Sequence, residues 1–139
     1  MNILVYAFRE DCKDHEQYHT WLIDRLRGDE PVGYNGVIDS NFVRIVTQPK
    51  IFQPPSEPET AFTFLRDVRS APVSTLVQEG PRHWEIFERL CLKAGARANL
   101  VPDAYIAALA MENGATLYTA DRGFARFPGL RRQHPLEDI

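Results

Sequence analysis

The sequence predicts an α/β fold in which helices cover both faces of a parallel sheet. Two observations support this prediction: segments with the period of an amphipathic helix alternate with short, apolar, β-branched segments, and the chain has no internal repeat or low-complexity stretch. Strands that alternate with helices are typical of parallel sheets. A length of 139 residues suffices for one domain with a substantial core but not for two, so we expect a single domain over residues 1–139.

Composition and charge narrow the class of protein. Hydrophobic residues make up 44% and charged residues 25% of the chain, as in ordinary globular domains. A net charge of −3 excludes an overall basic field, so any contact with nucleic acid must come from a local patch. Cys12 and Cys91 match no metal or redox spacing, and no apolar run approaches the ~20 residues of a membrane span. We therefore expect a cytoplasmic protein with reduced thiols and no membrane association.

Apolar periodicity and turn residues define the expected elements. Residues 2–8 are apolar and, taken alone, predict a strand. Ser56 and Glu59 have the spacing of a capping box, and Phe62 and Trp84 are expected in the core. The expected helices cover residues 15–27, 37–47, 57–70, 82–93 and 104–112, the expected strands cover 73–77, 115–119 and 130–135, and loops are expected at 28–36 and 48–55.

The most informative stretch is the last of these helices and the strand that follows it. Pro102 suits a helix entry, and Asp103 lies where the N–H groups of a first turn are unpaired. Asn113-Gly114 ends the helix, and Asp121 follows the strand, at the edge where open parallel sheets place their sites. We therefore expect two carboxylates at one edge of a sheet. Taken singly, Asp103 could equally be a helix cap and Asp121 a turn residue.

Between Asn99 and Leu130 the chain carries the runs Asn-Leu-Val-Pro-Asp-Ala, Ala-Ala-Leu-Ala, Thr-Ala-Asp-Arg and Phe-Ala-Arg-Phe-Pro-Gly-Leu. In this order they resemble the C-terminal half of PIN-domain ribonucleases, and in particular the VapC toxins of bacterial toxin–antitoxin pairs. The resemblance extends from Asn2 to Pro135. It implies a three-layer α/β/α fold with a central parallel sheet, an acidic cluster that holds Mg²⁺ or Mn²⁺, and cleavage of RNA. It also implies a cognate VapB-type antitoxin and a homodimer.

At the start of the chain, the family resemblance and the apolar pattern predict different secondary structures. PIN domains carry an Asp-x-Asn turn that leads from a first strand into a helical Leu-Val-Tyr-Ala segment, and Asn2 matches the Asn of that turn. Residues 2–8 would then be helical. The Asp and the strand before it would lie upstream of Met1, so we expect a truncated first strand and a functional protein that starts before Met1.

The resemblance also implies an acidic site that is depleted in this sequence. Asn41 stands where PIN domains often carry a metal-binding Glu, and Gly123 stands where many relatives carry a further Asp. Asp39 is the carboxylate nearest to Asn41, but two residues along a helix is ~200° around it, so we expect Asp39 to be a solvated charge. One metal ion is the most that Asp103 and Asp121 could hold.

Asp103 and Asp121 are the candidate catalytic and metal-binding residues. Thr119 would orient water or an acidic side chain, although an ordinary strand-end role explains it equally well. His15 is expected to cap or pack rather than to catalyse. The supporting residues are Asn2, Asn41 and Thr119. The candidate contacts to RNA phosphate are Arg44, which could instead pair with an acidic neighbour, and Arg82 and Arg122, with Arg126 and His83 as further candidates. Taken singly, a solvated surface group is the safer interpretation of the last four.

Two other functions stay open at the level of the sequence. A PIN fold that binds antitoxin or RNA without cutting is favoured by Asn41 and Gly123 and opposed by Asp103 and Asp121. A different metal-dependent α/β hydrolase, such as a phosphatase, would need a nucleophile motif that the chain does not show. An endoribonuclease toxin is therefore the leading hypothesis.

Overall fold

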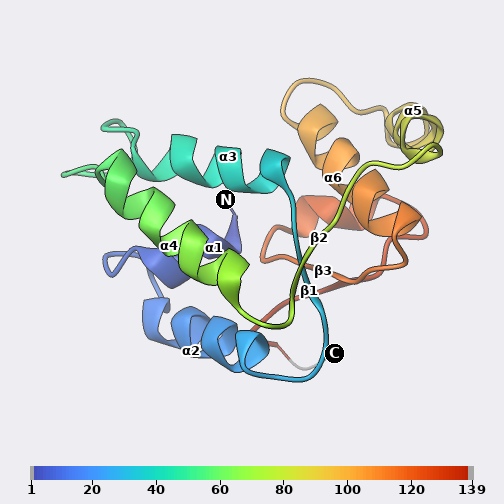
Figure 1. Cartoon of the computed structure of the whole chain (residues 1–139). Helices are drawn as coiled ribbons and strands as arrows, with labels where there is room; N and C mark the ends of the chain where they lie inside the picture. Colours follow the sequence, from blue (N-terminus) through green and yellow to red (C-terminus); the bar gives the residue numbers. More distant parts are fainter. Residues whose placement is uncertain (1, 138–139) are drawn as a thin grey trace. The chain divides into compact units, whose positions relative to one another are not determined.

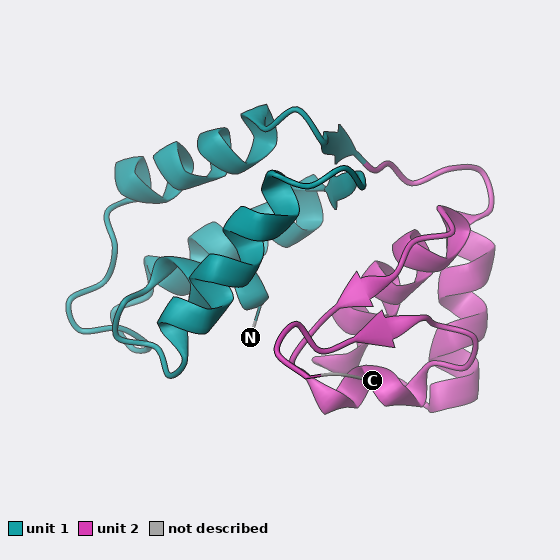
Figure 2. Ribbon diagram, turned by 90° about the horizontal axis from the view of Figure 1, so that it is seen from below, with its two compact units in different colours: residues 1–76 teal, residues 77–139 magenta. Residues whose placement is uncertain are grey.

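A computed structural model describes residues 2–137, and the chain divides into two compact units, residues 1–76 and 77–139 (Figure 2). Each unit contains one pair of parallel strands. The strands are parallel, as expected, and they form two separate pairs within residues 2–137. No helix within residues 2–137 is both long and apolar enough to cross a bilayer.

The first unit, residues 1–76, consists of four helices and one parallel strand pair in its described part (Figure 1). Helix α1 packs against α2 and α3, and α3 packs against α4. In the strand pair, Val32 lies opposite Ser74 and Tyr34 lies opposite Leu76. The elements are α1 (Ile3–Phe8), α2 (His15–Leu26), β1 (Val32–Tyr34), α3 (Gly36–Val46), α4 (Pro58–Ser70) and β2 (Ser74–Leu76).

An aromatic cluster forms the centre of the first unit. Phe42 is fully buried, and its ring contacts those of Phe8 and Phe64, each at a centroid distance of 5.3 Å. Val5 and Val46, also fully buried, complete the same core. Burial of one such aliphatic or aromatic side chain contributes ~1.5–3 kcal/mol, so this cluster holds α1, α3 and α4 together.

Several expectations for the first unit need correction. Residues 3–8 form a helix, as the resemblance implies and against the apolar pattern, because the Asn2 Oδ1 accepts the Leu4 N–H at 2.8 Å. Strand β1 lies inside the expected loop at 28–36. The expected capping box is wrong, since Glu57 is the N-cap residue and its side chain makes no capping hydrogen bond. Phe62 is 50% exposed rather than buried.

The second unit, residues 77–139, packs two helices and a short 3₁₀ helix around small side chains. Leu90 of α5, the alanine face of α6 and the rings of Phe124 and Phe127 form its buried core. The expected core residue Trp84 is instead 68% exposed. Leu117 lies opposite Arg132 in the parallel pair. The elements are α5 (His83–Ala94), α6 (Leu100–Glu112), β3 (Leu117–Tyr118), η1 (Arg122–Arg126) and β4 (Arg132–Gln133).

Gly114 ends α6 in the left-handed conformation, with φ +62°. Its N–H donates to the Met111 carbonyl at 3.2 Å, and the next N–H, of Ala115, donates to Ala110 at 2.9 Å. We expect Gly114→Ala to lower the free energy of unfolding by ~1–2 kcal/mol, the cost of a left-handed L-residue, in a denaturant titration. Gly36→Ala is the matched control, because Gly36 is helical and a Cβ there meets no atom within 4 Å. Equal effects of the two substitutions would contradict the prediction.

Candidate active site

Asp103 lies in the first turn of α6, which begins at Leu100 rather than at the expected Ala104. The N-cap residue is Asn99, so Asp103 is not the cap that one interpretation of the sequence allowed. Its carboxylate is half-buried and has no hydrogen-bond partner among residues 2–137. An acidic side chain in a first turn is stabilised by the helix dipole. This stabilisation needs no hydrogen bond to the carboxylate, so both oxygens are available to a ligand.

Asp121 is held by the turn that joins β3 to η1. Its backbone N–H donates to the Thr119 Oγ1 at 3.0 Å, and its own Oδ1 accepts the Gly123 N–H at 2.8 Å. Asp121 is thus the N-cap residue of η1, with Oδ2 unpaired among the described residues. A Cβ at Gly123 would lie 3.1 Å from Oδ1, which is a tight contact, so glycine suits this close approach.

The two carboxylates lie within electrostatic reach of each other. The pKa of Asp103 is raised above its ordinary value, first by burial and then by the negative charge of Asp121. Two like charges that interact in a half-buried site disfavour joint ionisation, and a divalent cation bound by both would remove that cost. Within the described residues no group of three His, Cys, Asp or Glu side chains could hold a metal ion.

Arg82 lies at the start of α5 and is positioned by the far end of α6. The Glu112 carboxylate accepts the Gly80 N–H at 2.7 Å and the Arg82 N–H at 2.9 Å, and these bonds lower the pKa of Glu112, the Gly80 bond most. The sequence interpretation missed Glu112, although an acid at a helix C-terminus opposes the helix dipole and so merits notice. His83 is buried with its Nε2 3.0 Å from the Tyr105 carbonyl, which removes it from the phosphate candidates.

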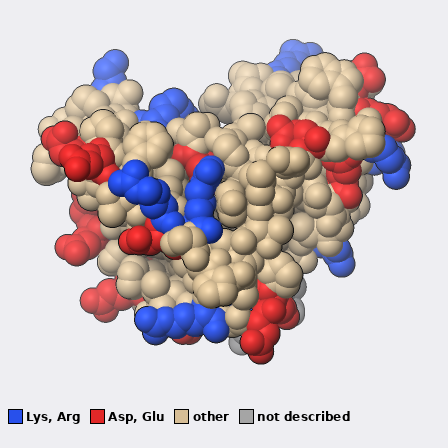
Figure 3. Space-filling view, in the orientation of Figure 1, with Lys and Arg blue, Asp and Glu red and all other residues tan. Residues whose placement is uncertain are grey.

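Two arginines follow Asp121 in the chain. Arg122 and Arg126 lie on η1, exposed and without an ion pair among the described residues. On the face drawn in Figure 3, acidic and basic side chains are interspersed rather than gathered into one basic field. Any phosphate contact in the second unit must therefore be local, as the net charge of −3 also requires.

The remaining candidates lie in the first unit, each with a local partner. Asn2 caps α1, and its Nδ2 donates to the Ile38 carbonyl at 3.1 Å. The Arg44 guanidinium donates to the Asn41 Oδ1 at 2.8 Å, so these two candidates pair with each other. Asn41 therefore accepts a hydrogen bond from a guanidinium group of the same helix.

The expectation that Asp39 is a solvated charge is wrong. Asp39 is only 5% exposed, and its Oδ2 accepts from the Arg69 Nε at 2.8 Å. The Arg69 guanidinium also lies 4.7 Å from the centre of the Tyr34 ring. Burial raises the pKa of Asp39, and the hydrogen bond and charge of Arg69 oppose that rise. This ion pair ties α3 to α4 beside β1.

Comparisons with known proteins agree with this architecture. The PIN domain family model matches residues 1–130. The chain is 39% identical over 137 residues to Ribonuclease VapC43 of Mycobacterium tuberculosis, covering 99% of this chain and 93% of that protein. It is 37% identical over 134 residues to Ribonuclease VapC37 of the same species, covering 96% and 93%.

A solved structure shows the same fold. The crystal structure of VapBC2 from Rickettsia felis, bound to a DNA fragment from its promoter, matches with a TM-score of 0.69 and 18% identity. The match covers 95% of this chain and 92% of that one. The chain therefore belongs to the PIN domain family and, within it, groups with the VapC ribonucleases.

Proposed function

We propose that this protein is a toxin that cleaves RNA by metal-dependent hydrolysis of phosphodiester bonds. The single observation that carries the proposal is the pair of carboxylates near enough to interact electrostatically, Asp103 on α6 and Asp121 after β3. Its relatives that are named as ribonucleases support the choice of RNA as the substrate.

The donors fit Mg²⁺ or Mn²⁺. Both cations prefer oxygen ligands, and Mg²⁺ in particular is commonly held by one or two carboxylates together with waters and substrate phosphate. Asp103 offers a carboxylate with no competing hydrogen bond, and Asp121 offers its Oδ2. Bound there, the metal would supply a polarised phosphoryl oxygen and a water of lowered pKa.

The protein groups hold this pair in place. The Gly123 N–H holds the Asp121 carboxylate and the Thr119 hydroxyl holds the Asp121 backbone, so that the side chain needs little reorganisation on binding. Asp103 is fixed by the helix whose alanine face is buried in the core of the second unit. Such preorganisation is what electrostatic catalysis requires.

Arginines would contact the RNA backbone without reading its sequence. Arg122 follows Asp121 directly and is exposed, and Arg82 is exposed at the start of α5. Arg44 is the weaker candidate, because its guanidinium is already paired with Asn41. Phosphate contacts of this kind position a substrate rather than select it.

We also propose a VapB-type antitoxin as the partner that neutralises the activity, and a homodimer as the assembly. The basis is the similarity to VapC proteins and the fold shared with a VapBC2 complex. The alternative of a PIN fold that binds without cutting is less favoured, because both carboxylates of the pair are retained and the relatives at 30–39% identity are named ribonucleases.

The test is an RNA digestion with the full chain, expressed with a candidate antitoxin and then separated from it. We expect cleavage with Mg²⁺ or Mn²⁺, none with EDTA, and recovery when the metal is returned in excess. The matched control for contaminating nuclease is Asp103→Asn purified in the same way. Cleavage that persists in EDTA, or that is equal in both preparations, would contradict the proposal.

A second readout does not depend on activity. At ~100 times its dissociation constant, a ligand that binds only the folded protein raises the free energy of unfolding by ~2.7 kcal/mol. We expect Mg²⁺ or Mn²⁺ to stabilise the wild-type protein in this way and to leave Asp103→Asn unchanged. Metal stabilisation without RNA cleavage would favour the binding-only alternative.

A further inference from the structure

Helix α2 begins with the run His15-Glu16-Gln17-Tyr18-His19, which the proposed function does not use. The pattern H-E-x-x-H on a helix places two imidazoles four residues apart on one face, where they can share a metal ion. The pattern is short and arises by chance, so its meaning depends on geometry. Here the two His side chains do lie together, with ring centroids 5.7 Å apart.

The ring spacing fits a shared ion. Imidazole nitrogens bind Zn²⁺ at ~2.0–2.1 Å, which places the centroids of two rings on one tetrahedral ion about 5 Å apart. The observed 5.7 Å is close to this value, and side-chain rotations would turn a nitrogen of each ring toward the ion. His19 is exposed, which leaves its ring free to make them.

His15 is already oriented as a metal-binding histidine usually is. Its Nδ1 lies 2.8 Å from the Tyr6 carbonyl oxygen, so Nδ1 carries the proton and donates, and Nε2 carries the lone pair. A backbone carbonyl behind the ligating ring is a common outer partner in metal sites. Among residues 2–137, neither His15 Nε2 nor the His19 ring has a hydrogen-bond partner.

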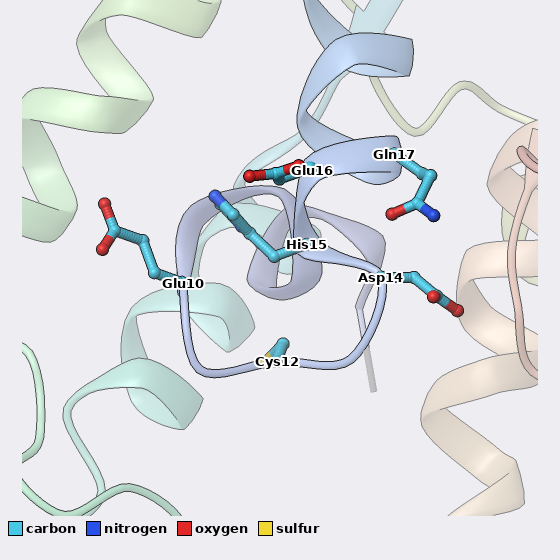
Figure 4. Close-up of a pocket in the computed structure, with 6 residues that line it drawn as sticks. All are labelled: Glu10, Cys12, Asp14, His15, Glu16 and Gln17. Carbon is cyan, nitrogen blue, oxygen red and sulfur yellow. The ribbon is translucent and has the colours of Figure 1, made fainter.

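Carboxylates lie around the same end of α2. A hollow of about 550 Å³ is lined by residues before and at the helix start, and its lining includes three carboxylates, those of Glu10, Asp14 and Glu16, beside His15 (Figure 4). Negative charge beside the His15 imidazole favours a cation over an anion. Packing alone explains His15, through its bond to Tyr6, whereas the ring contact that His19 makes within residues 2–137 is the one with His15.

The geometry points to a transition-metal site at His15 and His19, with Zn²⁺ as the reference ion. No third protein ligand completes a group of three among the described residues, so water fills the other positions and the ion is exchangeable. Imidazole favours Zn²⁺, Ni²⁺ and Cu²⁺, whereas the oxygens of Asp103 and Asp121 favour Mg²⁺ or Mn²⁺. The chain would then carry two metal sites of different chemistry, one in each unit.

The experiment is a Zn²⁺ titration by calorimetry on the full chain, with any histidine tag removed. We expect one ion per chain, and a loss of affinity of at least ~10-fold in His19→Gln. His19 is exposed, so this variant should fold as the wild type does, which thermal unfolding without metal checks. His134→Gln is the matched control, since it removes a histidine from the second unit and should leave the affinity unchanged.

Cu²⁺ provides a direct count of the ligands. The electron paramagnetic resonance spectrum should show two imidazole nitrogens in the wild-type protein and one in His19→Gln. No Zn²⁺ binding by the wild type, unchanged binding in His19→Gln, or an equal loss in His134→Gln would each overturn the site. Loss of Zn²⁺ binding in Asp103→Asn would also overturn it, because the ion would then lie at the carboxylate pair.

Discussion

Asp103→Asn is expected to lower RNA cleavage by ~100-fold or more while the protein stays folded. A metal ion contributes several kcal/mol to the stabilisation of a phosphoryl transition state, and each 1.36 kcal/mol lost is about tenfold in rate. Asparagine keeps the size of the side chain but removes the negative charge that the ion requires. Asp121→Asn should act in the same direction and less strongly, since the Asp121 Oδ1 already accepts the Gly123 N–H.

The same substitution should hold or raise the melting temperature at neutral pH. The pKa of Asp103 is raised in the folded state, so folding favours the neutral carboxyl and ionisation opposes it. The stability that this group confers is full below the pKa of the unfolded chain and is lost as the pH rises through the folded pKa. Any gain in Asp103→Asn should therefore shrink as the pH falls into the ordinary range of an aspartic acid.

The loss of activity is measured as the initial cleavage rate on one RNA. The change in melting temperature is measured by thermal unfolding at several pH values. Asp67→Asn is the matched control, because Asp67 is exposed on α4 and should change neither quantity. Full activity in a folded Asp103→Asn protein would remove Asp103 from the catalytic site. A fall in melting temperature at neutral pH would show instead that the carboxylate has a structural role.

Local signals predict the second unit well. The alanine face of α6, its glycine stop and the strand before Asp121 all follow from residues close together in the chain, and the structure shows all three, with a shorter strand and an earlier helix start than expected. The start of α6 shifted by a full turn because Pro102 is accepted inside a first turn as well as at its entry. This shift is why Asp103 lies inside the helix rather than at its cap.

Elements that depend on distant partners could not be predicted in this way. Strand β1 is three residues long and contains a glycine, and it is defined by pairing with β2 rather than by its own composition. The apolar run at residues 2–8 has no helical period, and the cap by Asn2 decides its conformation. Strand pairing decides the first case and a side-chain cap the second, and neither contact can be predicted from hydrophobic patterning.

The same limit of hydrophobic patterning applies to the candidate charged residues, as the ion pair of Asp39 shows. Asp39 and Asn41 are two residues apart on α3, ~200° around a helix, and Asp39 is the one that is buried. Its partner Arg69 is 30 residues away and on another helix. Only that distant guanidinium makes burial of the carboxylate tolerable, since an isolated buried charge is costly.

Arg69→Met is therefore expected to destabilise the protein by about 2 kcal/mol at neutral pH. Removal of one member of a buried ion pair typically costs ~3–5 kcal/mol, and the lower value allows for solvent at the Arg69 side chain, which is 40% exposed. Methionine keeps much of the aliphatic contact, so the loss reports mainly on the carboxylate left behind. Urea unfolding of the two proteins measures the difference.

The pH dependence separates this cause from a loss of packing. Arg69 opposes the rise in the pKa of Asp39, so its removal should raise that pKa further and make the neutral form still more favoured in the folded state. The deficit of Arg69→Met should then be largest at neutral pH and should shrink on acidification through the ordinary range of Asp. Asp39→Asn combined with Arg69→Met should recover most of the loss, because no charge is then buried. A deficit that is independent of pH and unrelieved in the double variant would mean that Arg69 stabilises α4 through its contact with the Tyr34 ring instead.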